Sequence, residues 1–137
     1  DYALSKWLDE TLPQDAIVAT DRRSSLFMPR PALHSDLAQM VDLAPIDDTE
    51  KRARLVEMLV RDKATMLVVT APPESSPYRW LLPELDSPVH TSPDYADAVR
   101  NPWRQGEPYR VLVYDVAGWV KQQGRVRQSN AASRGAN

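Results

Sequence analysis

The stretch that decides the fold is WLDETLPQDAIVATDRRSSLFMPRPALHSD, residues 7–36. It predicts a helix, then a buried strand, then a loop rich in arginine. Leu4, Trp7 and Leu8 have the i, i+3, i+4 spacing of one apolar helix face. Pro13 ends this helix, because proline lacks an amide donor and disfavours helical geometry in the residue before it. The first elements therefore predict an α/β protein.

Short apolar runs predict three inner strands, over residues 16–20, 65–70 and 109–114. A helix over 49–62 precedes the second run, with Asp47 as its N-cap and Glu50 completing a capping box. Two successive helix–strand units indicate a sheet with parallel members. We expect a single three-layer-like α/β domain over residues 1–124, with a small, mixed, largely parallel sheet.

The rest of the chain is less regular. Residues 72–108 hold eight of the twelve prolines, which predicts a proline-rich insertion with one helical turn at 94–99. Weaker patterns predict edge strands at 26–28 and 32–34. A short last helix is expected over 116–123, with Asp115 as its N-cap. The polar segment 125–137 predicts a disordered tail.

Composition excludes several classes of function. The 137 residues carry a net charge of −2, which argues against a nucleic-acid partner, since such proteins present a basic face. There is no cysteine, and the two histidines lack metal-ligand spacing. The four glycines form no phosphate-binding turn. We therefore expect no metal, no cofactor and no membrane-spanning segment, and the start at Asp1 suggests a piece of a longer protein.

The loop after the first strand holds the best candidate binding site. Its residues are Arg22, Arg23, Arg30 and His34, with Asp21 and Asp36 nearby. Guanidinium groups bind phosphate or carboxylate through two parallel hydrogen bonds, and ligands tend to sit at the carboxyl ends of strands in α/β sheets. The alternative is structural, in which the arginines pair with the two aspartates and cap the strand end.

The proline-rich insertion offers two further possibilities. Glu84 and Asp86 lie near Trp80, a combination that suits a sugar site but also occurs in ordinary loops. Trp80 and Trp103 could instead anchor a protein partner. By contrast, Trp7 and Trp119 occupy helix positions that face a core.

One resemblance follows from these residues. The pattern W-L-x-E-x-L-P-x-D-A-I-V-A-T, followed by L-F-M-P-R-P and L-H-S-D, covers about residues 2–36. It resembles the start of the soluble domain after the last transmembrane helix in bacterial GT-C glycosyltransferases, which act on lipid-linked sugars. The resemblance implies an extracytoplasmic domain attached to a parent transmembrane region. The catalytic carboxylate of that superfamily lies between membrane helices and has no counterpart here, so no catalytic residue is implied.

Three hypotheses remain open from the sequence. The first is a non-catalytic domain of a membrane glycosyltransferase-like protein that helps to bind a lipid-phosphate or sugar acceptor. The second is an independent protein-interaction or ligand-binding module. The third is a small enzyme that uses Glu84, Asp86 or His90 in a cleft.

Overall fold

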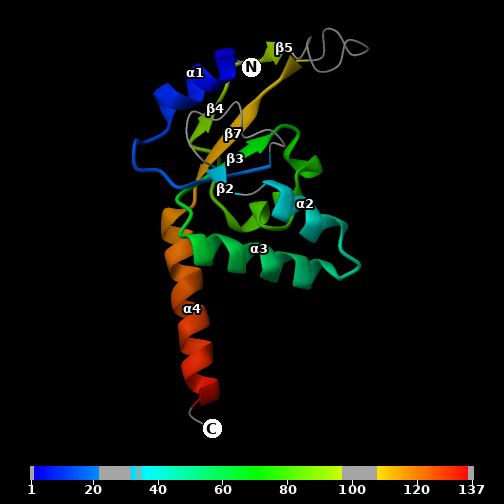
Figure 1. Ribbon diagram of the computed structural model, residues 1–137, viewed down its shortest axis with the longest axis vertical. Coiled ribbons are helices and arrows are strands. Elements are labelled where there is room, and N and C mark those ends of the chain that lie inside the picture. Colours follow the sequence, from blue (N-terminus) through cyan, green and yellow to red (C-terminus); the bar gives the residue numbers. More distant parts are fainter. Residues whose placement is uncertain (1, 22–31, 34, 97–107, 136–137) are drawn as a thin grey trace.

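The structure is a computed structural model that describes residues 2–21, 32–33, 35–96 and 108–135 (Figure 1). Its helices are α1 (Tyr2–Thr11), α2 (Ser35–Leu43), α3 (Asp48–Asp62) and α4 (Ala117–Gly135). Its strands are β1 (Val18–Thr20), β2 (Ala32–Leu33), β3 (Met66–Thr70), β4 (His90–Thr91), β5 (Tyr95–Ala96), β6 (Pro108–Tyr109) and β7 (Val111–Asp115). Three short 3-10 helices, η2 (Pro73–Ser75), η3 (Pro77–Trp80) and η4 (Leu82–Glu84), follow β3.

The main sheet has the strand order β2-β1-β3-β7-β4. β1 runs parallel to both β2 and β3, whereas β7 is antiparallel to β3 and β4. Val111, the first residue of β7, lies opposite Thr70, the last residue of β3. The proline-rich insertion therefore brings the chain back to the edge where β3 ends, so β7 must run in the opposite direction. The predicted α/β class with a mixed sheet is confirmed.

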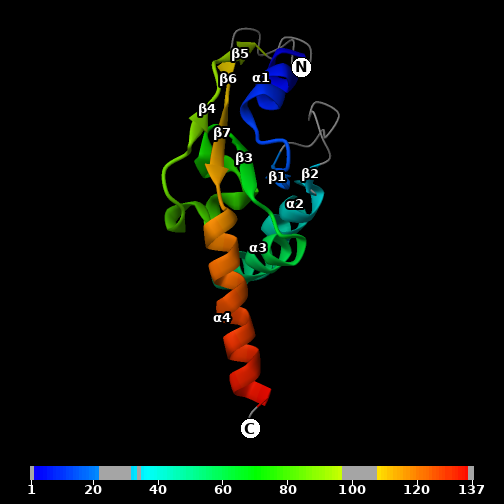
Figure 2. The same cartoon turned by 90° about the vertical axis from the view of Figure 1, so that its left-hand side faces the viewer.

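The sheet is covered on both faces, as the two views in Figures 1 and 2 show. Leu4 and Leu8 of α1 pack in one apolar cluster with Val68 of β3. Leu59 of α3 packs on the opposite face with Leu67 of β3. This alternation is what a strand in the middle of three layers requires, because successive side chains point to opposite faces. Buried apolar area of this kind is the main stabilising contribution to the fold.

The start of α3 has the predicted N-cap but not the predicted capping box. The Asp47 carboxylate accepts a hydrogen bond from the Glu50 N–H at 2.8 Å, which confirms the predicted N-cap. The Glu50 carboxylate accepts from Arg54 at 3.2 Å instead of closing the box. Lys63 ends the helix in the left-handed region, at φ 56°.

The C-terminal helix is longer than the sequence predicts. The sequence predicts a short helix over 116–123 and a disordered tail over 125–137, but α4 continues to Gly135 and extends beyond the other elements (Figure 2). Two features account for the longer helix. Residues 125–135 contain no proline and are mostly good or neutral helix formers, and the Arg127 guanidinium donates to the Ala53 carbonyl at 3.2 Å, which fixes α4 against α3.

Other segments differ from the sequence-based picture in smaller ways. α2 was not predicted, and β5 stands where a helical turn over 94–99 was expected. The edge strand predicted at 32–34 is present as β2, while the one at 26–28 lies outside the described residues. Within the described ranges, no helix has the length and apolarity needed to span a bilayer.

Candidate functional site

Two adjoining depressions lie at the edge of the sheet where β3 ends, and both are lined by Ala71 and Pro72. The larger, here the Arg110 pocket, has a volume of about 490 Å³. The smaller, here the Asp21 pocket, has a volume of about 310 Å³. Together they form the cleft, which occupies the edge of the sheet where α/β proteins commonly bind ligands.

The Asp21 pocket is built on a bond between two strand ends. Asp21 follows β1, and its backbone N–H donates to the Val68 carbonyl at 3.3 Å. Its carboxylate accepts from the Thr70 N–H at 3.0 and 3.1 Å, and from the Thr70 hydroxyl at 3.1 Å. These bonds fix the carboxylate beside the end of β3. Ser75 and Gln39 add a hydroxyl and an amide to the same lining.

Asp42 of α2 lines the Asp21 pocket and belongs to an ionic cluster with residues of η3. The Asp42 carboxylate accepts from the Arg79 guanidinium at 2.6 Å and from the Trp80 indole N–H at 3.3 Å. Burial opposes ionisation of Asp42, but the hydrogen bonds and charges of Arg79, Trp80 and Lys51 outweigh it and lower its pKa. The Arg79 guanidinium also lies 4.3 Å from the centre of the Trp80 ring. Arg79 and Trp80 therefore hold Asp42 in place without lining the pocket themselves.

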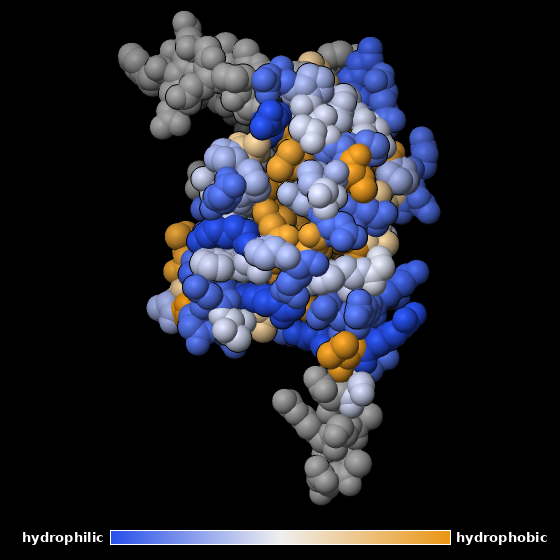
Figure 3. Space-filling view, turned by 180° about the vertical axis from the view of Figure 1, so that it is seen from behind, coloured by the Kyte–Doolittle hydropathy of each residue, from blue (hydrophilic) through white to orange (hydrophobic). Residues whose placement is uncertain are grey.

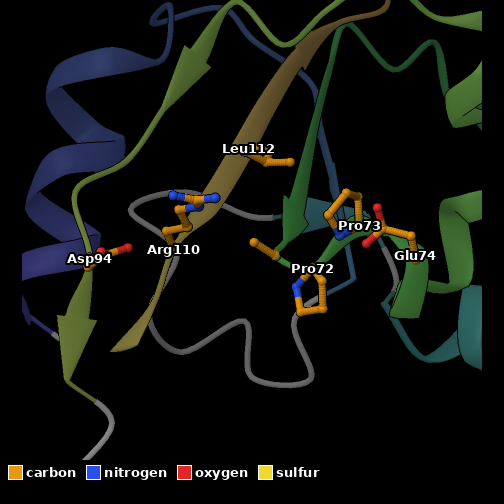
Figure 4. Close-up of a pocket in the computed structure, with 7 residues that line it drawn as sticks. Pro72, Pro73, Glu74, Asp94, Arg110 and Leu112 are labelled. Atoms are coloured by element: carbon orange, nitrogen blue, oxygen red, sulfur yellow. The ribbon is translucent and has the colours of Figure 1, made fainter. Parts of the chain in front are cut away.

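The Arg110 pocket faces the other side of Pro72. Figure 4 shows Arg110 and Asp94 on one side, with Pro72, Pro73 and Glu74 on the other. The Arg110 carbonyl accepts from the Ala71 N–H at 2.9 Å, which holds the two sides together. In the described part of the chain, no carboxylate lies within ion-pair distance of the Arg110 guanidinium, so its donors are free for a ligand.

A buried tyrosine lies close to the Asp21 pocket. The Tyr78 side chain is fully buried, and its hydroxyl has no hydrogen-bond partner among the described residues. Burial raises the pKa of Tyr78, and the negative charge of Asp21 raises it further. The phenol is therefore a neutral donor within electrostatic range of the cleft.

The lining of the cleft sets which ligands suit it. Four carboxylates and one guanidinium line it, from Asp21, Asp42, Glu74, Asp94 and Arg110. Carboxylates accept hydrogen bonds, hydroxyls and amides do both, and a guanidinium only donates. Such a surface suits an uncharged ligand with many hydroxyl groups. Among the described residues, no group of three or more potential ligand side chains could hold a metal ion.

The predicted site residues fall into two groups. Arg22, Arg23, Arg30 and His34 lie outside the described residues, although Asp21, directly before them, borders the cleft. The insertion residues do not form a site together. Glu84 pairs with Arg52, whose hydrogen bond lowers the pKa of Glu84 against the opposing effect of burial, and Asp86 and His90 are exposed.

Sequence reasoning missed Thr70, Ser75, Asp94 and Arg110. A signal was present for two of them, since Thr70 ends the predicted strand 65–70 and Arg110 lies near the start of the predicted strand 109–114. No comparable signal marks Ser75 or Asp94, which reach the cleft through the folding of the insertion.

Comparisons with protein families, with curated proteins and with solved structures found no match for this chain.

Proposed function

We propose that this chain is a non-catalytic domain of a bacterial membrane glycosyltransferase-like protein, and that its cleft binds the sugar part of the acceptor. The parent transmembrane region would hold the domain at the extracytoplasmic face. The single observation that carries the ligand proposal is the lining of the cleft, where carboxylates, hydroxyls and an amide meet at the carboxyl ends of β1 and β3.

The charge of the described walls favours a sugar over a phosphate. Four carboxylates and one guanidinium line the two pockets, and Arg79 pairs with Asp42 among them. The remaining carboxylates still outnumber Arg110, and like charges at close range repel a phosphate. A sugar hydroxyl can instead donate to a carboxylate while accepting from Arg110, so both kinds of wall contribute. Lipid-phosphate binding would need further cations, for which Arg22 and Arg23 are the candidates in the sequence.

Titration of the 137-residue chain followed by NMR tests this proposal. Neutral monosaccharides and a short prenyl phosphate are the probes, and the backbone signals of Asp21, Thr70, Ser75 and Arg110 are the readout. We expect a sugar to shift these signals in a saturable way. Shifts caused by the prenyl phosphate alone, and abolished by Arg22→Ala with Arg23→Ala, would replace the sugar with a phosphate ligand.

Two matched variants test whether the sugar binds in this cleft. Asp94→Asn removes one carboxylate from the Arg110 pocket and should weaken sugar binding about fivefold, the usual effect of one exposed hydrogen bond. Asp86→Asn is the control, because Asp86 is exposed and lies outside the cleft. Equal affinities for the two variants, or no sugar binding at all, would refute the proposed site.

A second candidate function is protein interaction through α2 and α3. Met40 and Leu43 of α2 are 65% and 74% exposed, and apolar side chains are visible at the left edge of Figure 3, the side on which α2 lies after the half turn from Figure 1. A groove of about 360 Å³ lies between the two helices, lined in part by Met40 and Met58. Methionine-rich surfaces adapt to several partners, and a second copy of the chain is the simplest one.

Sedimentation velocity tests this second candidate. We expect the wild-type chain to form dimers at high concentration, and Met40→Gln with Leu43→Gln to remain monomeric. Val89→Gln is a suitable control, since Val89 is also exposed, at 51%, but lies outside the groove. A wild-type chain that is monomeric at every concentration would argue against self-association through this groove.

A further inference from the structure

A separate pocket lies at the other end of β3, away from the cleft. It has a volume of about 370 Å³ and is formed where α3 leads into β3 and where α4 begins. Thr65 at this pocket precedes β3, whereas Thr70 at the cleft ends it. A ligand in this pocket would therefore not compete with one in the cleft. Its volume falls within the range of about 300–1,000 Å³ that is usual for small-molecule sites.

The interior of this pocket is apolar. Val60 and Ala64 line it from the end of α3, and Ala117 and Val120 line it from α4. The polar group of Thr65 is already engaged, because its hydroxyl accepts from the Ile17 N–H at 2.9 Å. The lining therefore offers apolar contacts and no free buried polar group to orient a polar ligand.

A glycine keeps the pocket open on the α4 side. Gly124 lies on the same helix face as Ala117 and Val120, at i+7 and i+4. A Cβ at Gly124 would lie 3.5 Å from Val60 Cγ1, which is ordinary van der Waals contact. An alanine is thus tolerated at position 124, whereas a longer side chain at that position would have to occupy the pocket.

Two cations complete the lining. They are Lys63 and Lys121, and both are exposed. Lys63 ends α3 with a left-handed backbone, and Lys121 belongs to α4. Within the described residues, neither ammonium group has a carboxylate within ion-pair distance. An apolar interior with two free cations is complementary to a molecule that combines an apolar tail with an anionic head.

We infer that this pocket binds a single-chain anionic amphiphile, a fatty-acid-like carboxylate whose tail enters between α3 and α4 and whose head meets Lys63 and Lys121. The tail supplies most of the affinity through burial of methylene groups. The lysines favour an anionic head over a neutral one of equal length. This inference does not depend on the sugar-binding proposal.

Calorimetric titration of the 137-residue chain with octanoate, nonanoate and decanoate, each below its micelle concentration, tests the role of the tail. Each added methylene should tighten binding about fourfold until the pocket is full. Decanol, which has the same tail and no charge, should bind roughly fivefold more weakly than decanoate. No decanoate binding, or an affinity independent of chain length, would overturn the inference.

Variants locate the site. Gly124→Leu should abolish decanoate binding, while Gly118→Leu, the same substitution on the same helix with open space around it, should leave it unchanged. Lys63→Gln with Lys121→Gln should bring decanoate down to the affinity of decanol. If Gly124→Leu fails to fold, Ala117→Leu fills the pocket from the preceding turns of α4. Decanoate binding that survives in a folded, pocket-filled variant would place the amphiphile elsewhere and refute the site.

Discussion

The carboxylate of Asp21 accepts hydrogen bonds from both the backbone N–H and the hydroxyl of Thr70, at 3.0 and 3.1 Å. The two residues are 49 positions apart: Asp21 directly follows β1, and Thr70 ends the neighbouring parallel strand β3. The Asp21 side chain thus bonds to the end of β3 and at the same time places a carboxylate in the cleft. A substitution of Asp21 would therefore change both the stability of the sheet edge and the lining of the cleft.

Removing the Thr70 hydroxyl should have a small effect and removing the Asp21 carboxylate a larger one. Thr70→Val keeps the shape and the N–H bond, so we expect a loss of about 1 kcal/mol in unfolding free energy. Asp21→Ala also leaves the Thr70 N–H without this partner and should cost about 2 kcal/mol. Urea unfolding measures both, with Thr91→Val on exposed β4 as the control. Equal losses for Asp21→Ala and the control would contradict the role of this bond.

The cluster around Asp42 predicts a dependence of stability on pH. Its pKa is lowered in the folded state, so its contribution is present above the unfolded value of about 3.9 and is lost as pH falls through the folded value. Asp42→Asn should destabilise the domain by about 1–2 kcal/mol at pH 7. That difference from the wild type should shrink below about pH 4.

Unfolding of wild type and variant between pH 2.5 and 7 measures this effect. Asp86→Asn is the control, since Asp86 is exposed and no ion pair or hydrogen bond of its side chain is seen among the described residues. A difference between wild type and Asp42→Asn that stays constant with pH would show that the ionised form of Asp42 is not what stabilises the cluster.

The parts of the fold that the sequence predicts are those that local chemistry determines. The strands β1, β3 and β7 are short apolar runs, and the start of α3 is marked by Asp47. Each of these signals depends on neighbours a few residues away. The same holds for Trp7 and Trp119, which pack against the two apolar clusters as their helix positions indicate.

The features that the sequence does not reveal depend on distant contacts. α4 continues past residue 123 in part because Arg127 reaches Ala53, 74 positions away. The cleft needs Thr70 to meet Asp21 and Arg110 to meet Ala71. No local pattern encodes these encounters, so the edge of the sheet could be predicted as the place of the site, but most of its lining could not.

Val68 offers a test of the central layer. It is fully buried in β3, on the face that α1 covers, and an unpaired carboxylate there would lose its hydration without compensation. We expect Val68→Asp to cost more than about 4 kcal/mol, enough to unfold a domain of ordinary stability. Val126→Asp, at a position of α4 that is 48% exposed, should retain the wild-type circular dichroism spectrum. A folded Val68→Asp variant would contradict the arrangement of layers.

The Tyr78 hydroxyl gives the most discriminating test, because it is buried and has no hydrogen-bond partner in the part of the chain that the structure describes. Such a group costs about 1–3 kcal/mol relative to one that is satisfied, so Tyr78→Phe should leave thermal stability unchanged or raise it by about 1 kcal/mol. Tyr78→Leu, which leaves a cavity, should lower it by about 2–4 kcal/mol.

Tyr78 also predicts a dependence of stability on pH, because its pKa is raised on folding. Its contribution to the free energy of unfolding is complete below the unfolded pKa of about 10 and is lost as pH rises above that value. The wild type should therefore lose stability between pH 10 and 11.5 faster than Tyr78→Phe. If Tyr78→Phe is destabilised as much as Tyr78→Leu, the hydroxyl has a partner in solution, and the cleft beside Asp21 extends to it.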